Sequence, residues 1–159
     1  MTRSVWRIAA DTPEYTADDL SGEGARRTGG RWNRTGLPVL YTSETRALAC
    51  LETLVHLKAV GLPFNRYLVR IDIPDEVWAK AERQTSRTLS VGWDAEPIGK
   101  VSIDFGSDWI ASGRSCLLLV PSVIIPEERN ILVNSAHTDH AGLAATKERR
   151  WLYDPRLGA

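Results

Sequence analysis

Hydrophobic and polar positions along this chain are spaced in a way that predicts many short strands. Residues 66–73 alternate like a half-buried strand, and residues 115–120 form a continuous apolar run of the kind found in central strands. Shorter apolar runs bounded by turn residues predict three further strands, over residues 5–9, 37–42 and 130–133. The tail over residues 151–157 is predicted to be extended.

The clearest helix is predicted over residues 44–60, where leucine and valine recur at intervals of three and four. Ser43 is expected to cap its N-terminus, and Gly61 and Pro63 are expected to end it. Two short helices are predicted over residues 75–83 and 104–111. Residues 21–36 form a glycine-rich loop, and residues 84–100 have no clear pattern.

The order of these elements favours an α+β fold in a single domain. Helices and strands do not alternate regularly, and no glycine-rich turn joins a strand to a helix, which excludes a Rossmann-type dinucleotide fold. The length of 159 residues suits one ordinary domain, so we assign residues 1–159 to it. A content of 43% hydrophobic and 25% charged residues is typical of a folded domain.

The charges balance overall but are unevenly placed. The chain has 20 basic and 20 acidic residues, and this zero net charge disfavours a nucleic-acid-binding domain. Residues 11–23 contain acidic but no basic side chains, whereas residues 26–34 contain four arginines and no acidic side chain. Such a local cationic segment suits a small anionic ligand better than a long polyanion.

The cysteines and the apolar runs are those expected of a cytoplasmic protein. Cys50 and Cys116 stand singly within apolar segments, so we expect buried thiols and no disulfide framework. No apolar run reaches the roughly 18 residues of a membrane span, and the N-terminal residues lack the apolar core of a signal peptide. His137, Asp139 and His140 are clustered without a fourth ligand, so no metal site is expected.

The densest motif is Gly29-Gly30-Arg31-Trp32-Asn33. Two glycines permit positive φ angles and close approach of a ligand, and their N–H groups can form an anion-binding nest. Arg31 follows directly and is placed to bind a phosphate or carboxylate in two parallel hydrogen bonds. The alternative is a tight turn that carries a solvated arginine.

Three other residues have side chains suited to chemistry. Glu52 lies on a mostly apolar face of the predicted helix, so it marks either a functional site or a boundary carboxylate paired with an arginine. Tyr41 follows an apolar run and either stacks on a planar ring or packs in the core. Ser122 follows the strongest apolar strand and lies either in a cleft or in a strand-ending turn.

Several short motifs, in order and over nearly the whole chain, resemble the RES domain, the toxin of Xre–RES toxin–antitoxin systems. The family takes its name from an arginine, a glutamate and a serine, which match Arg31, Glu52 and Ser122, with Ser112 as a weaker candidate for the serine. The matching stretches are Trp6-Arg7-Ile8, Gly29 to Asn33, Tyr41, Ala49 to Glu52 with His56, Trp109, Val120-Pro121-Ser122, Asn134 with His137, and Asp154 to Leu157.

The resemblance implies a fold similar to ADP-ribosyltransferases, with a bent, split β-sheet around a nicotinamide cleft and flanking helices. It also implies a toxin that uses NAD⁺ as its substrate, without a further cofactor, and cleaves the nicotinamide–ribose bond by hydrolysis or phosphorolysis. The alternative is an ADP-ribosyltransferase that modifies a protein target, and a nucleic-acid-targeting toxin is less consistent with the zero net charge.

Each part of NAD⁺ then has an expected contact in this chain. Arg31 and the backbone of Gly29 and Gly30 hold the phosphates, and Trp32 and Asn33 complete the substrate site. The catalytic residues are expected to be Glu52, Arg31, Tyr41 and Ser122. Among them, Tyr41 is expected to stack on nicotinamide and Glu52 to face the ribose. The expected partner is an Xre-like helical antitoxin that blocks the active site in a hetero-oligomeric complex, with no membrane or direct nucleic-acid binding.

Overall fold

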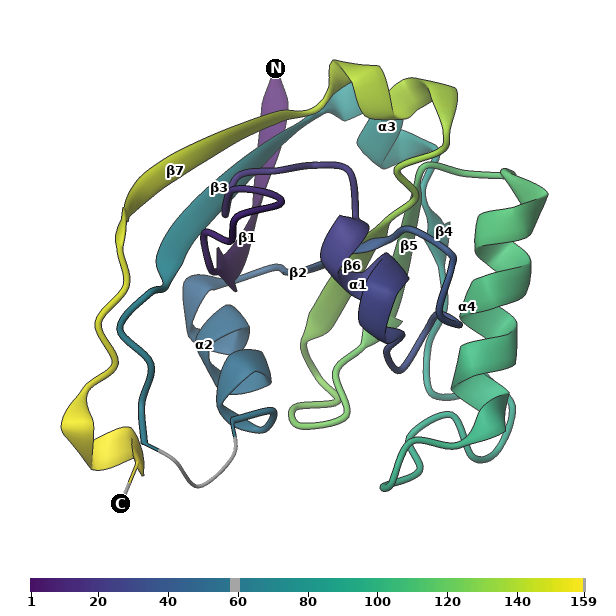
Figure 1. Cartoon of the computed structure of the whole chain (residues 1–159). Coiled ribbons are helices and arrows are strands. Elements are labelled where there is room, and N and C mark those ends of the chain that lie inside the picture. Colours follow the sequence, from purple (N-terminus) through teal and green to yellow (C-terminus); the bar gives the residue numbers. More distant parts are fainter. Residues whose placement is uncertain (58–60, 159) are drawn as a thin grey trace.

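The described residues of the chain fold into one mixed, seven-stranded sheet with helices packed against it (Figure 1). This computed structural model describes residues 1–57 and 61–158. The strands are β1 (Thr2–Ala9), β2 (Leu40–Ser43), β3 (Tyr67–Pro74), β4 (Glu82–Arg83), β5 (Leu117–Pro121), β6 (Arg129–Val133) and β7 (Ala144–Arg150). Their order in the sheet is β4-β5-β6-β2-β1-β3-β7, in which β4 and β5 are parallel and the other neighbours antiparallel.

The sheet is split between β1 and β2. These two strands pair through Trp6 and Ser43, whereas β1 pairs with β3 along its whole length. The sheet therefore divides into a β4-β5-β6-β2 part and a β1-β3-β7 part, which lie on opposite sides of Figure 1. This arrangement confirms the predicted α+β fold with a split sheet.

The helices are short and cover different parts of the sheet. Among the described residues, no helix is long and apolar enough to cross a bilayer. The α-helices are α1 (Glu23–Thr28), α2 (Arg46–Leu54), α3 (Asp75–Ala79) and α4 (Lys100–Ser112), and the 3₁₀-helices are η1 (Thr138–Gly142) and η2 (Pro155–Gly158).

Strand β5 shows how both faces of the sheet are buried. All five of its residues are buried, and alternate side chains enter different core clusters. Leu117 and Leu119 join one cluster, whereas Leu118 and Val120 join a second one around Trp109 of α4. The continuous apolar run predicted a central strand, and its burial on both faces confirms that prediction.

The helix predicted over residues 44–60 exists but is shorter. It begins at Arg46 because Ser43 belongs to β2 and Thr45 is the N-cap, accepting a hydrogen bond from the Leu48 N–H at 3.0 Å. Helix α2 ends at Leu54, and the predicted residues 58–60 lie outside the described residues.

Two segments predicted to be irregular or extended contain helical turns. Within the predicted loop 21–36, Glu23 binds Arg26 and Arg27 one turn further on, and this pairing supports α1 between two glycines with positive φ. In the predicted extended tail, the Asp154 carboxylate accepts the Arg156 N–H and starts η2. The sequence pattern missed both because local ion pairs, not apolar spacing, form these turns.

Other boundaries shifted, and one strand was missed. The helices predicted over residues 75–83 and 104–111 correspond to α3, which ends at Ala79, and to α4, which begins at Lys100. The missed strand is β7, which has the mostly charged sequence AATKERR. It lies at the edge of the sheet, where side chains are exposed and need not be apolar.

The two cysteines lie where the sequence placed them. Cys50 and Cys116 are free and buried, with exposed fractions of 8% and 3%. Burial raises the pKa of the Cys116 thiol to about 12, so this thiol stays protonated at neutral pH. Both act as small apolar side chains in the core.

Candidate functional site

A cavity of about 950 Å³ lies next to the split in the sheet. Its walls come from β1, β2, α1, α2 and the turn after β5, together with the loop that carries Glu96 and Ile98. This volume is near the upper end of the roughly 300–1,000 Å³ usual for small-molecule and cofactor sites. The cavity is therefore large enough for a dinucleotide.

The Glu52 carboxylate is held in this cavity by two side-chain donors. Its Oε1 atom accepts hydrogen bonds from Ser122 Oγ at 2.7 Å and from Asn130 Nδ2 at 2.8 Å. The Asn130 amide is fixed in turn by Ser43, whose hydroxyl donates to Oδ1 at 2.8 Å. No described residue makes an ion pair with Glu52 or donates to Oε2, so the arginine-paired alternative is not the one observed.

Ser122 lies behind Glu52, not on the cavity wall. It is fully buried directly after β5, and its hydroxyl accepts the N–H groups of Ile124 and Ile125 at 3.1 and 3.2 Å. It therefore lies in the strand-ending turn, the second of the two sequence alternatives, and from there its hydroxyl donates to Glu52, which lines the cavity. Ser112 lies at the end of α4, where its hydroxyl donates to the Trp109 carbonyl.

The Gly29–Asn33 motif forms a tight turn. Gly30 and Asn33 face each other in an isolated bridge, with Arg31 and Trp32 at the tip. The N–H groups of Gly29 and Gly30 donate to the carbonyls of Ala25 and Asn33 at 2.8 and 3.1 Å. These two donors are used within the protein, so the expected phosphate nest is not formed by them.

Tyr41, which lines the cavity, and Asn33, which is buried and does not belong to the cavity wall where it was expected, hold this turn together. The Tyr41 hydroxyl accepts the Trp32 N–H at 2.9 Å and donates to Asn33 Oδ1 at 2.6 Å. Burial raises the pKa of Tyr41, so its hydroxyl remains a donor. A Cβ atom on Gly30 would lie 2.7 Å from that oxygen, which explains the glycine. Tyr41 thus lines the cavity and also positions the turn.

The two side chains at the tip of the turn lie in different surroundings. Trp32 is 3% exposed and stacks on Trp93 in the core, with ring centroids 6.2 Å apart, while part of it forms cavity wall. Arg31 lines the cavity and binds the loop that carries Trp93, Ala95 and Glu96.

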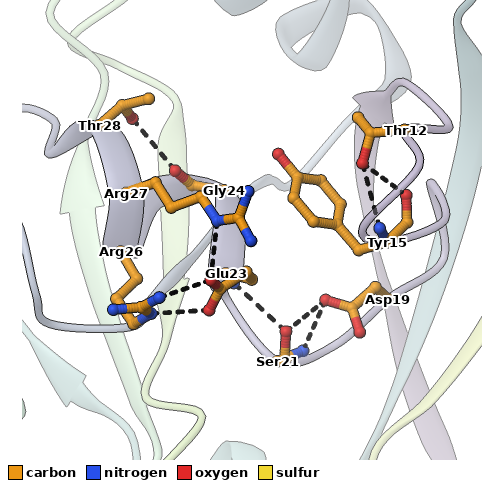
Figure 2. A network of polar contacts seen from close by, with 9 residues as sticks. All are labelled: Thr12, Tyr15, Asp19, Ser21, Glu23, Gly24, Arg26, Arg27 and Thr28. Atoms are coloured by element: carbon orange, nitrogen blue, oxygen red, sulfur yellow. Dashed lines mark hydrogen bonds and ion pairs between the residues drawn. The ribbon is translucent and has the colours of Figure 1, made fainter.

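The cationic segment predicted over residues 26–34 is largely neutralised by local ion pairs. Figure 2 shows the Glu23 carboxylate between Arg26 and Arg27, and these hydrogen bonds lower the pKa of Glu23 to about 2. Arg34 pairs with Asp104 on α4. The arginines therefore do not form one anion site, and of these four only Arg31 is among the cavity-lining residues.

Arg7 on β1 is a cavity residue that the sequence analysis did not single out. Its Nε atom is buried without a hydrogen-bond partner among the described residues, and no described carboxylate pairs with it. Burial lowers the pKa of Arg7, while the nearby Asp19 and Tyr15 favour its charged form. An arginine stays charged despite such a shift, so Arg7 places a positive charge in the cavity wall. The Trp6-Arg7-Ile8 motif was the available signal.

Comparison with known proteins shows what kind of domain carries this cavity. The family model described as the RES domain matches residues 4–154. The chain belongs to the RES domain family. This confirms the resemblance found in the motifs, and the structure brings Glu52 and Ser122 into contact and places Arg31 on the wall of the same cavity.

Three similar proteins support the assignment. The "Prs ADP-ribosylating toxin" of Sphingobium sp. (strain YBL2) is 62% identical over 157 residues, covering 99% of this chain and 98% of that protein. "Toxin Res" of Yersinia enterocolitica is 34% identical over 144 residues, covering 90% and 93%. A chain in the crystal structure of the M. tuberculosis MbcT-MbcA toxin–antitoxin complex is 19% identical, with a TM-score of 0.69 over 99% of this chain and 87% of that chain, and it shares the fold. This RES domain is accordingly a toxin.

Two further polar residues of the RES domain were not predicted from the sequence. Asn130 on β6 and Ser43 on β2 are 87 positions apart and become hydrogen-bonded because their strands pair in register. No local pattern marks either residue, since each stands beside another polar residue, Arg129 or Thr42, near a strand end.

His137 and His140, the two histidines of the cluster considered as metal ligands, take structural roles in this RES domain, whereas His56 lines the cavity. His140 contacts the Leu20 carbonyl at 2.7 Å, and His137 Nδ1 accepts the Asp139 N–H in η1. Within residues 1–57 and 61–158, no three His, Cys, Asp or Glu side chains are grouped so that they could hold a metal ion.

Replacing Ser122 with alanine is expected to lower the NAD⁺ turnover that the family resemblance implies about tenfold, because Glu52 loses one of its two donors. The variant should also lose roughly 1–3 kcal/mol of unfolding free energy, since two buried N–H groups lose their acceptor. The measurements are kcat and KM for NAD⁺ together with the melting temperature. Ser112→Ala is the matched control, and a larger loss of kcat in that variant would reverse the assignment of the family serine.

Proposed function

We propose that this RES domain cleaves the bond between nicotinamide and ribose in NAD⁺ and passes the ADP-ribosyl group to water or phosphate. The observation that carries the proposal is one cavity that combines Glu52, whose Oε1 atom accepts two hydrogen bonds, with the positive charges of Arg7 and Arg31. In the reaction, the C1′–N bond breaks and its electron pair leaves with neutral nicotinamide. The acceptor oxygen then bonds to C1′; water loses a proton to the solvent in this step, whereas an anionic phosphate oxygen has none to lose.

Glu52 supplies electrostatic stabilisation in this scheme. Positive charge develops on the ribose as nicotinamide leaves, as in glycoside hydrolysis. Ser122 and Asn130 hold Oε1, and we place Oε2 next to the ribose. A carboxylate about 4 Å from a unit positive charge gains roughly 4 kcal/mol at an effective dielectric near 20. That energy corresponds to about three decades in rate.

The cations of the cavity fit the pyrophosphate of NAD⁺. Arg7 has a buried donor without a partner, so an anion that binds it relieves an unfavourable burial. Arg31 presents a second guanidinium on the same cavity. Tyr41 offers an aromatic ring for the nicotinamide, and NAD⁺ as the substrate makes a further cofactor unnecessary.

Arg7→Gln is expected to raise KM for NAD⁺ about tenfold with little change in kcat, because phosphate contacts contribute to ground-state binding. Steady-state kinetics of nicotinamide release measure both constants. Arg3→Gln, on the same strand but outside the cavity lining, serves as the control. An unchanged KM in Arg7→Gln would remove Arg7 from the phosphate site.

A second candidate function is ADP-ribosyl transfer to a protein. The relative that is 62% identical over nearly its whole length is named a Prs ADP-ribosylating toxin. The same cavity would cleave NAD⁺, and only the acceptor would differ. The neighbouring fold comes from a toxin–antitoxin complex, so we also propose an antitoxin partner, an Xre-like helical protein that blocks this cavity in a hetero-oligomeric assembly.

The test is incubation of the purified chain with NAD⁺, alone, with phosphate and with purified Prs. Chromatography separates nicotinamide, ADP-ribose and a phosphorylated ADP-ribose, and mass spectrometry detects modified Prs. Release without Prs supports hydrolysis or phosphorolysis and the co-product names the acceptor, whereas release that requires Prs supports the second candidate. No nicotinamide in any mixture would refute both.

A further inference from the structure

Arg31 makes an ion pair with Glu96 that has no role in the proposed reaction. Its Nη1 atom donates to the backbone carbonyls of Trp93 at 3.2 Å and Ala95 at 2.9 Å. Its Nη2 atom donates to Glu96 Oε2 at 2.8 Å. Arginine has five N–H donors, so these contacts leave the Nε–H and one Nη2 N–H of Arg31 without a partner among the described residues.

The two partners of this ion pair differ strongly in exposure. The Arg31 side chain is 15% exposed, whereas the Glu96 side chain is 74% exposed. Glu96 also lines the cavity, in a loop that the sequence pattern left unassigned. A carboxylate in such a position returns to water at little cost, because an ion pair with one exposed partner contributes little to stability. The backbone carbonyls, by contrast, fix the guanidinium whether or not Glu96 stays.

We propose that Glu96 is a specificity-determining residue whose carboxylate competes with the phosphate groups of the ligand for the Nη2 donors of Arg31. The inference rests on the proposed function for the identity of the ligand. A pyrophosphate displaces Glu96 because it brings more charge and can bind Nη2 together with the free Nε–H in two parallel hydrogen bonds. A ligand without phosphates cannot displace Glu96 from Arg31, so the Arg31–Glu96 ion pair selects for ligands that carry phosphate groups.

If Glu96 competes with the ligand, Glu96→Gln should bind NAD⁺ and pyrophosphate more tightly, whereas if Glu96 positions Arg31, the variant should bind both more weakly. If the carboxylate competes, its removal lowers KM for NAD⁺ and tightens the binding of inorganic pyrophosphate, each by about threefold to tenfold, with kcat unchanged. If Glu96 only oriented Arg31, the same variant would weaken both. The measurements are nicotinamide-release kinetics and calorimetric titration with pyrophosphate.

Asp94→Asn is the matched control, because it removes the same charge from an exposed position of the same loop outside the cavity lining. The gain should also vanish when Arg31 is already alanine, since a double-mutant cycle isolates the coupling between the two residues. An equal gain in Asp94→Asn, or a gain that persists in the Arg31→Ala background, would overturn the proposal.

The pyrophosphate titration separates this proposal from the proposed function. If the wild-type chain releases no nicotinamide, NAD⁺ cleavage fails as a function, and tighter pyrophosphate binding by Glu96→Gln would still support competition at Arg31. Equal or weaker pyrophosphate binding by Glu96→Gln, or no binding by either protein, would overturn the role of Glu96 whatever the kinetics show.

Discussion

Glu52→Gln is expected to reduce NAD⁺ cleavage by about 10²- to 10³-fold while the protein remains folded. The amide has nearly the shape of the carboxylate, and its oxygen still accepts the hydrogen bonds from Ser122 and Asn130. What it lacks is the negative charge, whose interaction with the developing cation we place at roughly 4 kcal/mol. Single-turnover release of nicotinamide measures the effect on the chemical step.

The control for this prediction removes a carboxylate elsewhere. Glu148→Gln on β7, an edge strand, breaks an ion pair with Arg70 outside the cavity lining, and it should leave turnover unchanged. Equal melting temperatures of wild type and Glu52→Gln would show that the fold is intact. Turnover at the wild-type rate in a folded Glu52→Gln protein would exclude Glu52 from the mechanism.

Gly106→Ala is expected to lower the free energy of unfolding by about 2 kcal/mol or more. A Cβ atom at position 106 would lie 1.9 Å from the backbone oxygen of Trp32. Alanine favours a helix interior over glycine by about 1 kcal/mol, so the overpacking must exceed that gain. Because backbone atoms lie in the way, the clash moves the whole turn that carries Arg31 and Trp32.

Thermal unfolding measures this effect, and the expected shift in melting temperature is about 5 °C or more. Gly24→Ala in α1 is the control, since its added Cβ would meet only the end of the Tyr15 side chain, at 3.0 Å, and that side chain can move. The control should change stability by about 1 kcal/mol or less. A Gly106→Ala protein as stable as wild type would show that α4 and the turn can separate without cost.

Fold class and the main strands could be read from the sequence because both depend on local apolar spacing. The run over β5 predicted a central strand, and the alternation over residues 66–73 predicted β3. Helix α1 and strand β7 escaped this reasoning because ion pairs and edge position, not apolar periodicity, define them. The predicted N-cap of α2 was wrong for a similar reason: Ser43 belongs to strand β2, so Thr45 is the N-cap instead.

For the candidate site, the sequence by itself determined the residue types: a glutamate on an apolar helix face, a serine after a buried strand and an arginine in a glycine-rich turn. Only the tertiary structure decided their partners. Strand pairing brings Asn130 and Ser43 together, and the turn after β5 brings Ser122 to Glu52 across 70 residues. The orientation of Arg31 toward Glu96 likewise depends on a loop without regular structure. Contacts between distant segments follow from the packing of the whole chain, so no local pattern encodes them.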